Sequence, residues 1–175
     1  MKTKLDNRSW VAIHGSQEST WISIVMKIKA VITTHFHTDH SLYSLQYVQA
    51  GIPVFEPCRP PIKDSEMRFR KGNFDIRAFE NRDKSGRWLH NNGDGSECPC
   101  VWVLHLRIPE MGSLVYATDT EYVRWRFKDV NHIMVEANYD MQFVNREEPN
   151  YEHRLRGHMS LQRHLTLFLL TITRH

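Results

Sequence analysis

The sequence contains the stretch Val31-Ile32-Thr33-Thr34-His35-Phe36-His37-Thr38-Asp39-His40, in which a β-branched run leads directly into four potential metal ligands. The run predicts a buried strand, because β-branched side chains pack well in a pleated sheet. Along a strand His35 and His37 project to the same side, and a helical turn after them directs Asp39 and His40 toward the same point. This spacing predicts two histidine ligands for one metal and an aspartate and a histidine for a second. Imidazole suits zinc, and carboxylate suits zinc, manganese or iron.

The composition places this stretch in an ordinary globular chain. The 175 residues predict a single domain over 1–175, and 41% apolar with 25% charged residues exclude a disordered chain. No apolar run reaches the roughly eighteen residues of a membrane span, and the N-terminus makes a poor signal peptide. With three cysteines, too few for a disulfide framework, this predicts a cytoplasmic protein without a membrane partner. The formal charge of +3 permits an anionic partner without requiring one.

Apolar runs elsewhere in the chain predict more strands than helices. The strands are expected at 52–55, 101–106, 114–117 and 133–135, with a hairpin over 69–79 that turns near 71–73. One short helix is expected over 41–50, and 161–172 fits either a helix or a strand. Several strands end at a polar residue, which predicts an α+β fold with a site on the loops at one sheet edge.

The H-x-H-x-D-H pattern after an apolar strand resembles the signature of the metallo-β-lactamase superfamily. Later segments resemble further motifs of that family in the same order: GIPVF at 51–55, ATDT at 117–120, VEANYD at 135–140 and GHMS at 157–160. The resemblance covers roughly residues 28–162 and implies an αββα sandwich. The last two motifs resemble the small phosphodiesterase and exonuclease branch, which is related to ribonuclease Z and ribonuclease J.

Asp119 ends an apolar strand, where a carboxylate is not expected to be buried unless something positive meets it. The alternative is an aspartate that caps a turn. The resemblance implies that Asp119 bridges two metals. Glu136 has two interpretations, a residue that orients a metal-bound histidine or a simple strand end, and Asp140 is equally explained as a loop cap.

A third histidine for the first metal is implied by the resemblance in the loop before Val101. His90 is the preferred candidate, and His105 is better explained as a half-buried residue inside a strand. The resemblance also implies that His158 contacts the scissile phosphate and assists the leaving group. A histidine at the start of a helix suits that role, because backbone N–H groups there favour an anion. A surface histidine in a basic loop is the alternative.

Together these motifs imply a metal-dependent hydrolase, a phosphodiesterase or nuclease that uses a metal-activated hydroxide. The implied metal ligands are His35, His37, Asp39, His40, His90 and Asp119. Asp39 and His158 are the implied catalytic residues, two divalent ions are the cofactors, and a nucleic acid or another phosphodiester is the substrate. Zinc is the default metal and manganese the alternative. Two other functions stay open: hydrolysis of a thioester or lactone on the same fold, and a degenerate, non-catalytic module that binds metal or nucleic acid.

The chain departs from the family at both ends. The residues before Lys29 match poorly, and the final histidine that normally follows the GHLS motif has only His164 and His175 as candidates. The expected sandwich is therefore incomplete at both ends.

Three further features carry weaker predictions. Segments 68–71 and 124–126 mix cations with aromatic rings, which suits a phosphate backbone and stacked bases, although solvated surfaces explain them as well. Cys98 and Cys100 lack the second ligand pair of a structural zinc site and are expected to be ordinary thiols.

Overall fold

The computed structural model describes residues 10–13, 28–56, 66–98 and 101–172. The chain divides into two compact units, Met1–Glu56 and Pro57–His175, which are described separately.

The first unit contains a three-stranded parallel sheet in the order β1-β2-β3. Its elements are β1 (Trp10–Ile13), β2 (Ile28–Ile32), α2 (Thr38–Ser41), α3 (Ser44–Gln49) and β3 (Val54–Phe55). Strands β2 and β3 run in the same direction, so the chain must cross over between them, and α2 and α3 form that crossover. The core of the unit consists of Ile28, Val31, Tyr47 and Ile52. The metal-ligand motif therefore starts at the carboxyl end of a buried strand, as the sequence predicts.

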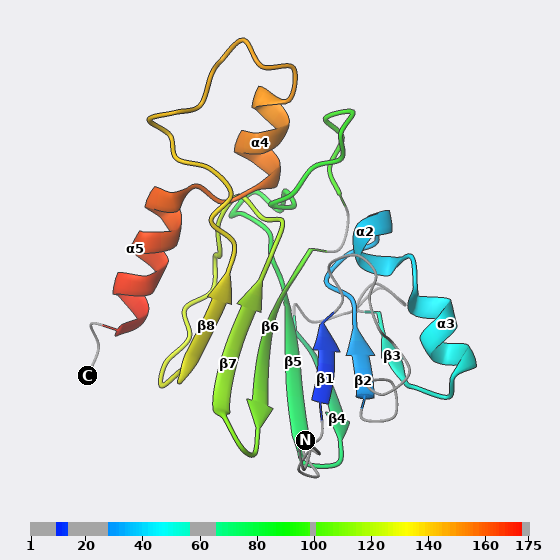
Figure 1. The fold of residues 1–175 in the computed structure, drawn as a ribbon. Coiled ribbons are helices and arrows are strands. Elements are labelled where there is room, and N and C mark those ends of the chain that lie inside the picture. The colour runs from blue at the N-terminus through cyan, green and yellow to red at the C-terminus, as the bar shows by residue number, and fades with distance from the viewer. Residues whose placement is uncertain (1–9, 14–27, 57–65, 99–100, 173–175) are drawn as a thin grey trace, which may run out of the picture. The chain divides into compact units, whose positions relative to one another are not determined.

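The second unit contains a five-stranded mixed sheet in the order β4-β5-β6-β7-β8 (Figure 1). The strands are β4 (Glu66–Lys71), β5 (Phe74–Glu80), β6 (Trp102–Ile108), β7 (Gly112–Ala117) and β8 (His132–Val135). The first four strands pair antiparallel, whereas β7 and β8 pair parallel. Strands β5, β7 and β8 consequently run in the same direction and finish at one edge, which we call the carboxyl edge. The loops that leave this edge carry the polar residues of the unit's candidate site.

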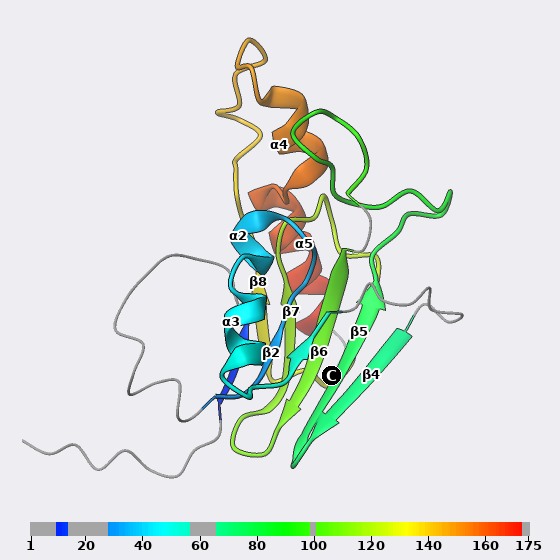
Figure 2. The same cartoon turned by 90° about the vertical axis from the view of Figure 1, so that its right-hand side faces the viewer.

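Two helices complete the second unit, α4 (Tyr151–Gly157) and α5 (Leu161–Ile172). Helix α4 lies beyond the carboxyl edge, and α5 lies alongside β8 (Figures 1 and 2). Strand β6 is the central strand and buries most of its side chains on both faces. On one face Val103, Val115 and Ala117 form a cluster that is covered by the apolar residues of the loop between β7 and β8. That loop is thus part of the packed structure.

Most predicted elements are confirmed. The hairpin turns at Gly72, within the predicted 71–73, and its φ of 56° favours glycine. Residues 161–172, for which a helix and a strand were both open, form a helix. The expected single helix over 41–50 is wrong, because the structure has two short helices, α2 and α3. Within this segment Tyr47 packs into the core, whereas Leu42, Leu45 and Val48 are exposed. Helix α4 was not predicted.

Within the described residues, no helix is both long enough and apolar enough to cross a membrane. The combination of mixed sheets with a few short helices agrees with the predicted α+β class.

Candidate metal centre

Three histidines of the first unit pack against one another directly after β2. The ring centroids of His35 and His37 are 4.7 Å apart, and those of His35 and His40 are 4.1 Å apart. His35 and His40 are buried, and the hydroxyl of Thr34 lies 3.1 Å from His35 Nδ1. A hydrogen bond at Nδ1 fixes the ring orientation and directs Nε2 toward a ligand position.

The turn that gathers these rings is fixed by its own backbone. The N–H groups of His40 and Ser41 both donate to the carbonyl of His37, at 2.9 and 3.0 Å. The Ser41 hydroxyl adds bonds to the carbonyls of Phe36 and His37. Asp39 is the most exposed of the predicted ligands, with a side chain that is 75% exposed and an oxygen 3.4 Å from His40 Nε2. The turn thus brings the three imidazole rings together, and the carboxylate of Asp39 lies at the edge of this group.

Asp119 and Glu136 meet at the carboxyl edge of the second unit, at the ends of β7 and β8. Asp119 has a φ of 47°, a left-handed conformation that is uncommon for residues other than glycine and is tolerated by aspartate. Its backbone N–H donates to Glu136 Oε2 at 2.7 Å. This bond holds Asp119 in its unusual conformation, and backbone strain of this kind is concentrated at functional sites.

His158 completes a three-residue cluster with these two carboxylates. Its Nδ1 lies 2.5 Å from Glu136 Oε1 and 3.2 Å from Asp119 Oδ1, and ligand atoms of all three residues lie within 4.8 Å of one another. Burial disfavours the charged ring, but the hydrogen bonds to Asp119 and Glu136 outweigh it and raise the pKa of His158 to about 9. In the metal-free chain the imidazolium therefore supplies the positive charge that the two carboxylates require.

His90 lies in the loop between β5 and β6, as predicted, and is buried. Its Nδ1 donates to the carbonyl of Gly157 at 2.7 Å, a contact between residues 67 positions apart. A carbonyl oxygen can only accept a hydrogen bond, so the ring proton of His90 lies on Nδ1, and Nε2 carries the lone pair. A histidine fixed in this tautomer by a backbone carbonyl is the usual arrangement of a metal ligand. By contrast, His105 lies within β6 and is half-buried, as the sequence predicts.

His153 of α4 extends the histidine group around His90. Its ring centroid lies 6.2 Å from that of His90 and 5.4 Å from that of His158. Its Nδ1 lies 3.1 Å from Asn91 Oδ1. The chain turns closely past these rings at Gly157, where an added Cβ would lie 3.2 Å from His90 Nδ1 and 3.3 Å from His153 Cε1. Glycine at this position therefore allows the backbone to approach His90 closely enough to orient it.

A buried polar network supports the carboxyl edge. The Asn81 amide donates to Thr120 Oγ1 at 2.7 Å, and the Thr120 hydroxyl lies 3.0 Å from the carbonyl of Leu89. Both Asn81 and Thr120 are fully buried. This network ties the loop of His90 to the loop of Asp119, so the two loops keep a fixed spacing.

The donor atoms present suit a divalent metal. The first unit gathers imidazoles, and the second offers imidazole with carboxylate, which are the donor types of zinc and manganese sites. The carboxylates of Asp119 and Glu136 already share a cation in the form of His158, so the site is built to hold positive charge. Burial, with a contribution from Asp119, raises the pKa of the Cys98 thiol to about 11. Cys100 lies outside the described residues.

Each unit thus gathers part of the predicted set. The first unit brings together His35, His37 and His40, and the second brings together His90, Asp119 and His158. Of the predicted candidates for a final ligand, His164 lies in α5 and His175 lies outside the described residues. Glu136 contacts the backbone N–H of Asp119 and the ring of His158, and its orienting role stays a prediction. Sequence reasoning missed His153, and it included Gly157 only as part of the GHMS motif, without its contact to His90.

Comparisons with known proteins give a likeness to a solved structure. No family model matches the sequence, and no curated protein matches it either. The crystal structure of the metallo-β-lactamase fold protein YhfI from Bacillus subtilis is similar to this chain, with a TM-score of 0.50 and 18% sequence identity. The likeness supports a metallo-β-lactamase-like fold.

The matched region covers 79% of this chain and 58% of YhfI, so the chain spans less than two thirds of the length of that protein. At this level of identity the likeness concerns the fold, and it does not extend to the ribonuclease Z and ribonuclease J branch. The details of the sandwich and the roles of the individual ligands stay predictions.

Proposed function

We propose that this protein is a metal-dependent hydrolase that cleaves phosphodiester bonds. The observation that carries the proposal is the arrangement at the carboxyl edge, where Asp119 in a left-handed conformation, Glu136 and His158 converge beside a buried His90 of fixed tautomer. The imidazole group after β2 and the metallo-β-lactamase-like fold support it.

The proposed ligand assignment follows the order of the motifs along the chain. His35, His37 and His90 would hold one divalent ion, Asp39 and His40 would hold a second, and Asp119 would be a ligand shared by both. When bound, the ions supply Lewis acidity and lower the pKa of a bound water, which is the chemistry that hydrolysis of a phosphodiester needs. Zinc is the first choice and manganese the second.

The chain's own residues orient the attacking water and protonate the leaving oxygen. In this proposal the exposed carboxylate of Asp39 orients the attacking water. His158, protonated through its hydrogen bonds to Asp119 and Glu136, holds a proton close to the carboxyl edge and is suited to donate it to the leaving oxygen. Glu136 acts through Asp119 and His158 and is a positioning residue. The phosphodiester is proposed because His158 can donate a proton to the leaving oxygen of a phosphate ester and can contact its anionic phosphate.

Hydrolysis of bis(p-nitrophenyl) phosphate by the metal-loaded full chain tests the proposal. Asp119→Asn should lower turnover by at least about a hundredfold, since the bridging carboxylate is lost. Asp129→Asn is the matched control, because Asp129 is an exposed aspartate that also has a positive φ, 54°. Turnover that persists in the presence of a chelator would end the proposal.

The same assay separates the other candidate functions. A panel of thioesters and lactones hydrolysed faster than the phosphodiester would favour the second enzyme class. A chain that binds metal but hydrolyses none of these substrates would favour a non-catalytic module.

A further inference from the structure

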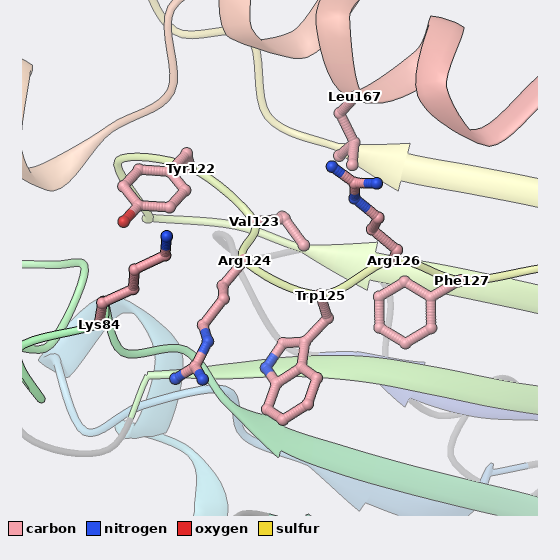
Figure 3. A pocket seen from close by; sticks show the side chains of 8 residues that line it. All are labelled: Lys84, Tyr122, Val123, Arg124, Trp125, Arg126, Phe127 and Leu167. Atoms are coloured by element: carbon pink, nitrogen blue, oxygen red, sulfur yellow. The ribbon is translucent and has the colours of Figure 1, made fainter.

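A hollow of about 320 Å³ lies on the second unit beside the loop between β7 and β8 (Figure 3). We call it the basic-aromatic hollow, because its walls combine three cations with three aromatic rings. They are Lys84, Tyr122, Arg124, Trp125, Arg126 and Phe127. The candidate metal ligands do not line it.

Hydrogen bonds fix the walls of the hollow in place. The Asn81 amide donates to the carbonyl of Tyr122 at 2.7 Å, and its oxygen accepts from the backbone N–H of Arg124 at 3.1 Å. The Trp125 indole donates to the carbonyl of Glu80 at 2.7 Å. The loop is therefore anchored to the end of β5, and a ligand would meet surfaces that are already arranged.

The loop alternates between apolar and cationic side chains. Val123, Trp125 and Phe127 pack inward on the sheet, whereas Arg124 and Arg126 are exposed. Figure 3 shows that the Arg124 and Arg126 side chains extend in different directions from the loop, so their positive charges are spread around the hollow. Charge spread in this way suits a ligand with several phosphates better than a single anion.

No carboxylate of the described residues forms an ion pair with Lys84, Arg124 or Arg126. The acidic groups that face Tyr122, which are Asp83 and Glu121, are both paired with Arg87, at 3.0 and 2.9 Å. Glu121 also pairs with Arg163. The positive charge of the hollow is consequently not neutralised within the described part of the chain.

The aromatic rings add flat apolar surface next to these cations. Trp125 packs on Phe79 with ring centroids 5.2 Å apart, which fixes its plane, and the Arg124 guanidinium lies 5.5 Å from the Trp125 ring. Figure 3 shows the rings of Tyr122, Trp125 and Phe127 along the same hollow as the cationic side chains. Aromatic rings beside exposed cations are the features that bind unstacked bases and their phosphates together.

We infer that the basic-aromatic hollow binds a single-stranded nucleic acid, with the cations on phosphates and the rings on bases. A duplex fits less well, since its bases are already stacked and present no face to the rings. Tyr122 follows Asp119 by three residues on the same loop, so a strand in the hollow continues toward the carboxyl edge. The inference names the substrate class of the proposed hydrolase, and in that respect it rests on the proposed function. Binding in the hollow is tested separately from hydrolysis.

Fluorescence anisotropy with labelled oligothymidylate and oligouridylate of about ten nucleotides tests the inference. A duplex of the same length is the third probe, and a chelator is present throughout to prevent hydrolysis. The full chain should bind both single strands more tightly than the duplex. The relative affinity of the two single strands distinguishes DNA from RNA.

Two variants separate the phosphate contacts from the stacking contacts. Arg124→Gln combined with Arg126→Gln should weaken binding about tenfold at about 0.1 M salt and reduce the slope of log K against log salt by about 1.4, or ~0.7 for each lost contact. Tyr122→Leu should weaken binding about tenfold without changing the slope.

The matched control removes two exposed cations outside the hollow and outside segment 68–71, Arg107→Gln on β6 with Arg146→Gln in the loop before α4. Because the change in net charge is the same, affinity within about twofold of the wild type supports a local site. An equal loss in the control, a duplex bound as tightly as the single strands, or full affinity in the double arginine variant would overturn the inference.

The outcomes also separate this inference from the proposed function. If the chain binds the oligonucleotides but does not hydrolyse bis(p-nitrophenyl) phosphate with metal, the proposed hydrolase is refuted and the inferred binding site stands. If it hydrolyses the small phosphodiester but does not bind the oligonucleotides, the inferred binding site is refuted and the proposed hydrolase stands.

Discussion

Replacing Glu136 with glutamine should destabilise the metal-free protein in a pH-dependent way. Glu136 accepts hydrogen bonds from the backbone N–H of Asp119 and from the ring of His158, at 2.7 and 2.5 Å. Glutamine keeps the shape and one acceptor, but it presents an N–H₂ group to the second donor. The substitution therefore removes a charge-assisted bond with little change in volume.

The magnitude follows from the pKa of His158, which rises from its ordinary value of 6.5 to about 9 in the folded chain. A rise of this size corresponds to roughly 3 kcal/mol in favour of the charged ring, and Asp119 and Glu136 share it. Loss of Glu136 should thus cost about 1–2 kcal/mol of unfolding free energy. Because the folded pKa lies above the unfolded one, this stability is fully present below 6.5 and is lost as the pH rises through about 9.

Urea unfolding in the presence of a chelator measures this difference. At about pH 6 Glu136→Gln should be less stable than the wild type by about 1–2 kcal/mol. At about pH 10 the neutral ring can accept from the glutamine amide through Nδ1, so the difference should nearly vanish. A stability loss that is the same at both pH values would refute the assigned hydrogen bonds.

Three further substitutions test the surroundings of the site. Gly157→Ala should lower the free energy of unfolding in urea by about 1–3 kcal/mol, because the new Cβ crowds His90. It should also weaken zinc binding, measured by calorimetry, by about tenfold or more. Zinc affinity equal to that of the wild type would contradict the role of the close approach between Gly157 and His90. His153→Gln retains an N–H for its neighbour's amide oxygen, so zinc affinity should fall by less than about tenfold, and a total loss would make His153 itself a ligand. Asn81→Leu should cost roughly 3 kcal/mol of unfolding free energy, since it leaves buried backbone groups and the Thr120 hydroxyl short of partners, and a neutral result would argue against the network.

The features that depend on local sequence were predictable. A β-branched run predicts β2, and the turn at Gly72 follows from glycine's tolerance of a positive φ. Asp119 and Glu136 were noticed because a carboxylate at the end of an apolar strand needs an explanation, and the structure places the two together.

The features that depend on distant contacts were not predictable. The carbonyl that orients His90 belongs to Gly157, and nothing in the residues around either position indicates that the two meet. Helix α4 has seven mostly polar residues, too few for a hydrophobic period, so His153 had no predicted element to place it. The apolar residues of 41–50 suggested one helix, but Tyr47 forms the core contact and leaves Leu45 exposed.

The central claim is that imidazoles and carboxylates of this chain hold divalent metal, and the metal content of the purified full chain tests it most directly. After loading with zinc and gel filtration, elemental analysis should give about two equivalents per chain. His37→Ala and Asp119→Asn should each reduce this value, whereas His132→Ala, a change at an exposed histidine of β8, should leave it unchanged. A wild-type chain that retains no zinc, or variants that retain as much as the wild type, would contradict the account.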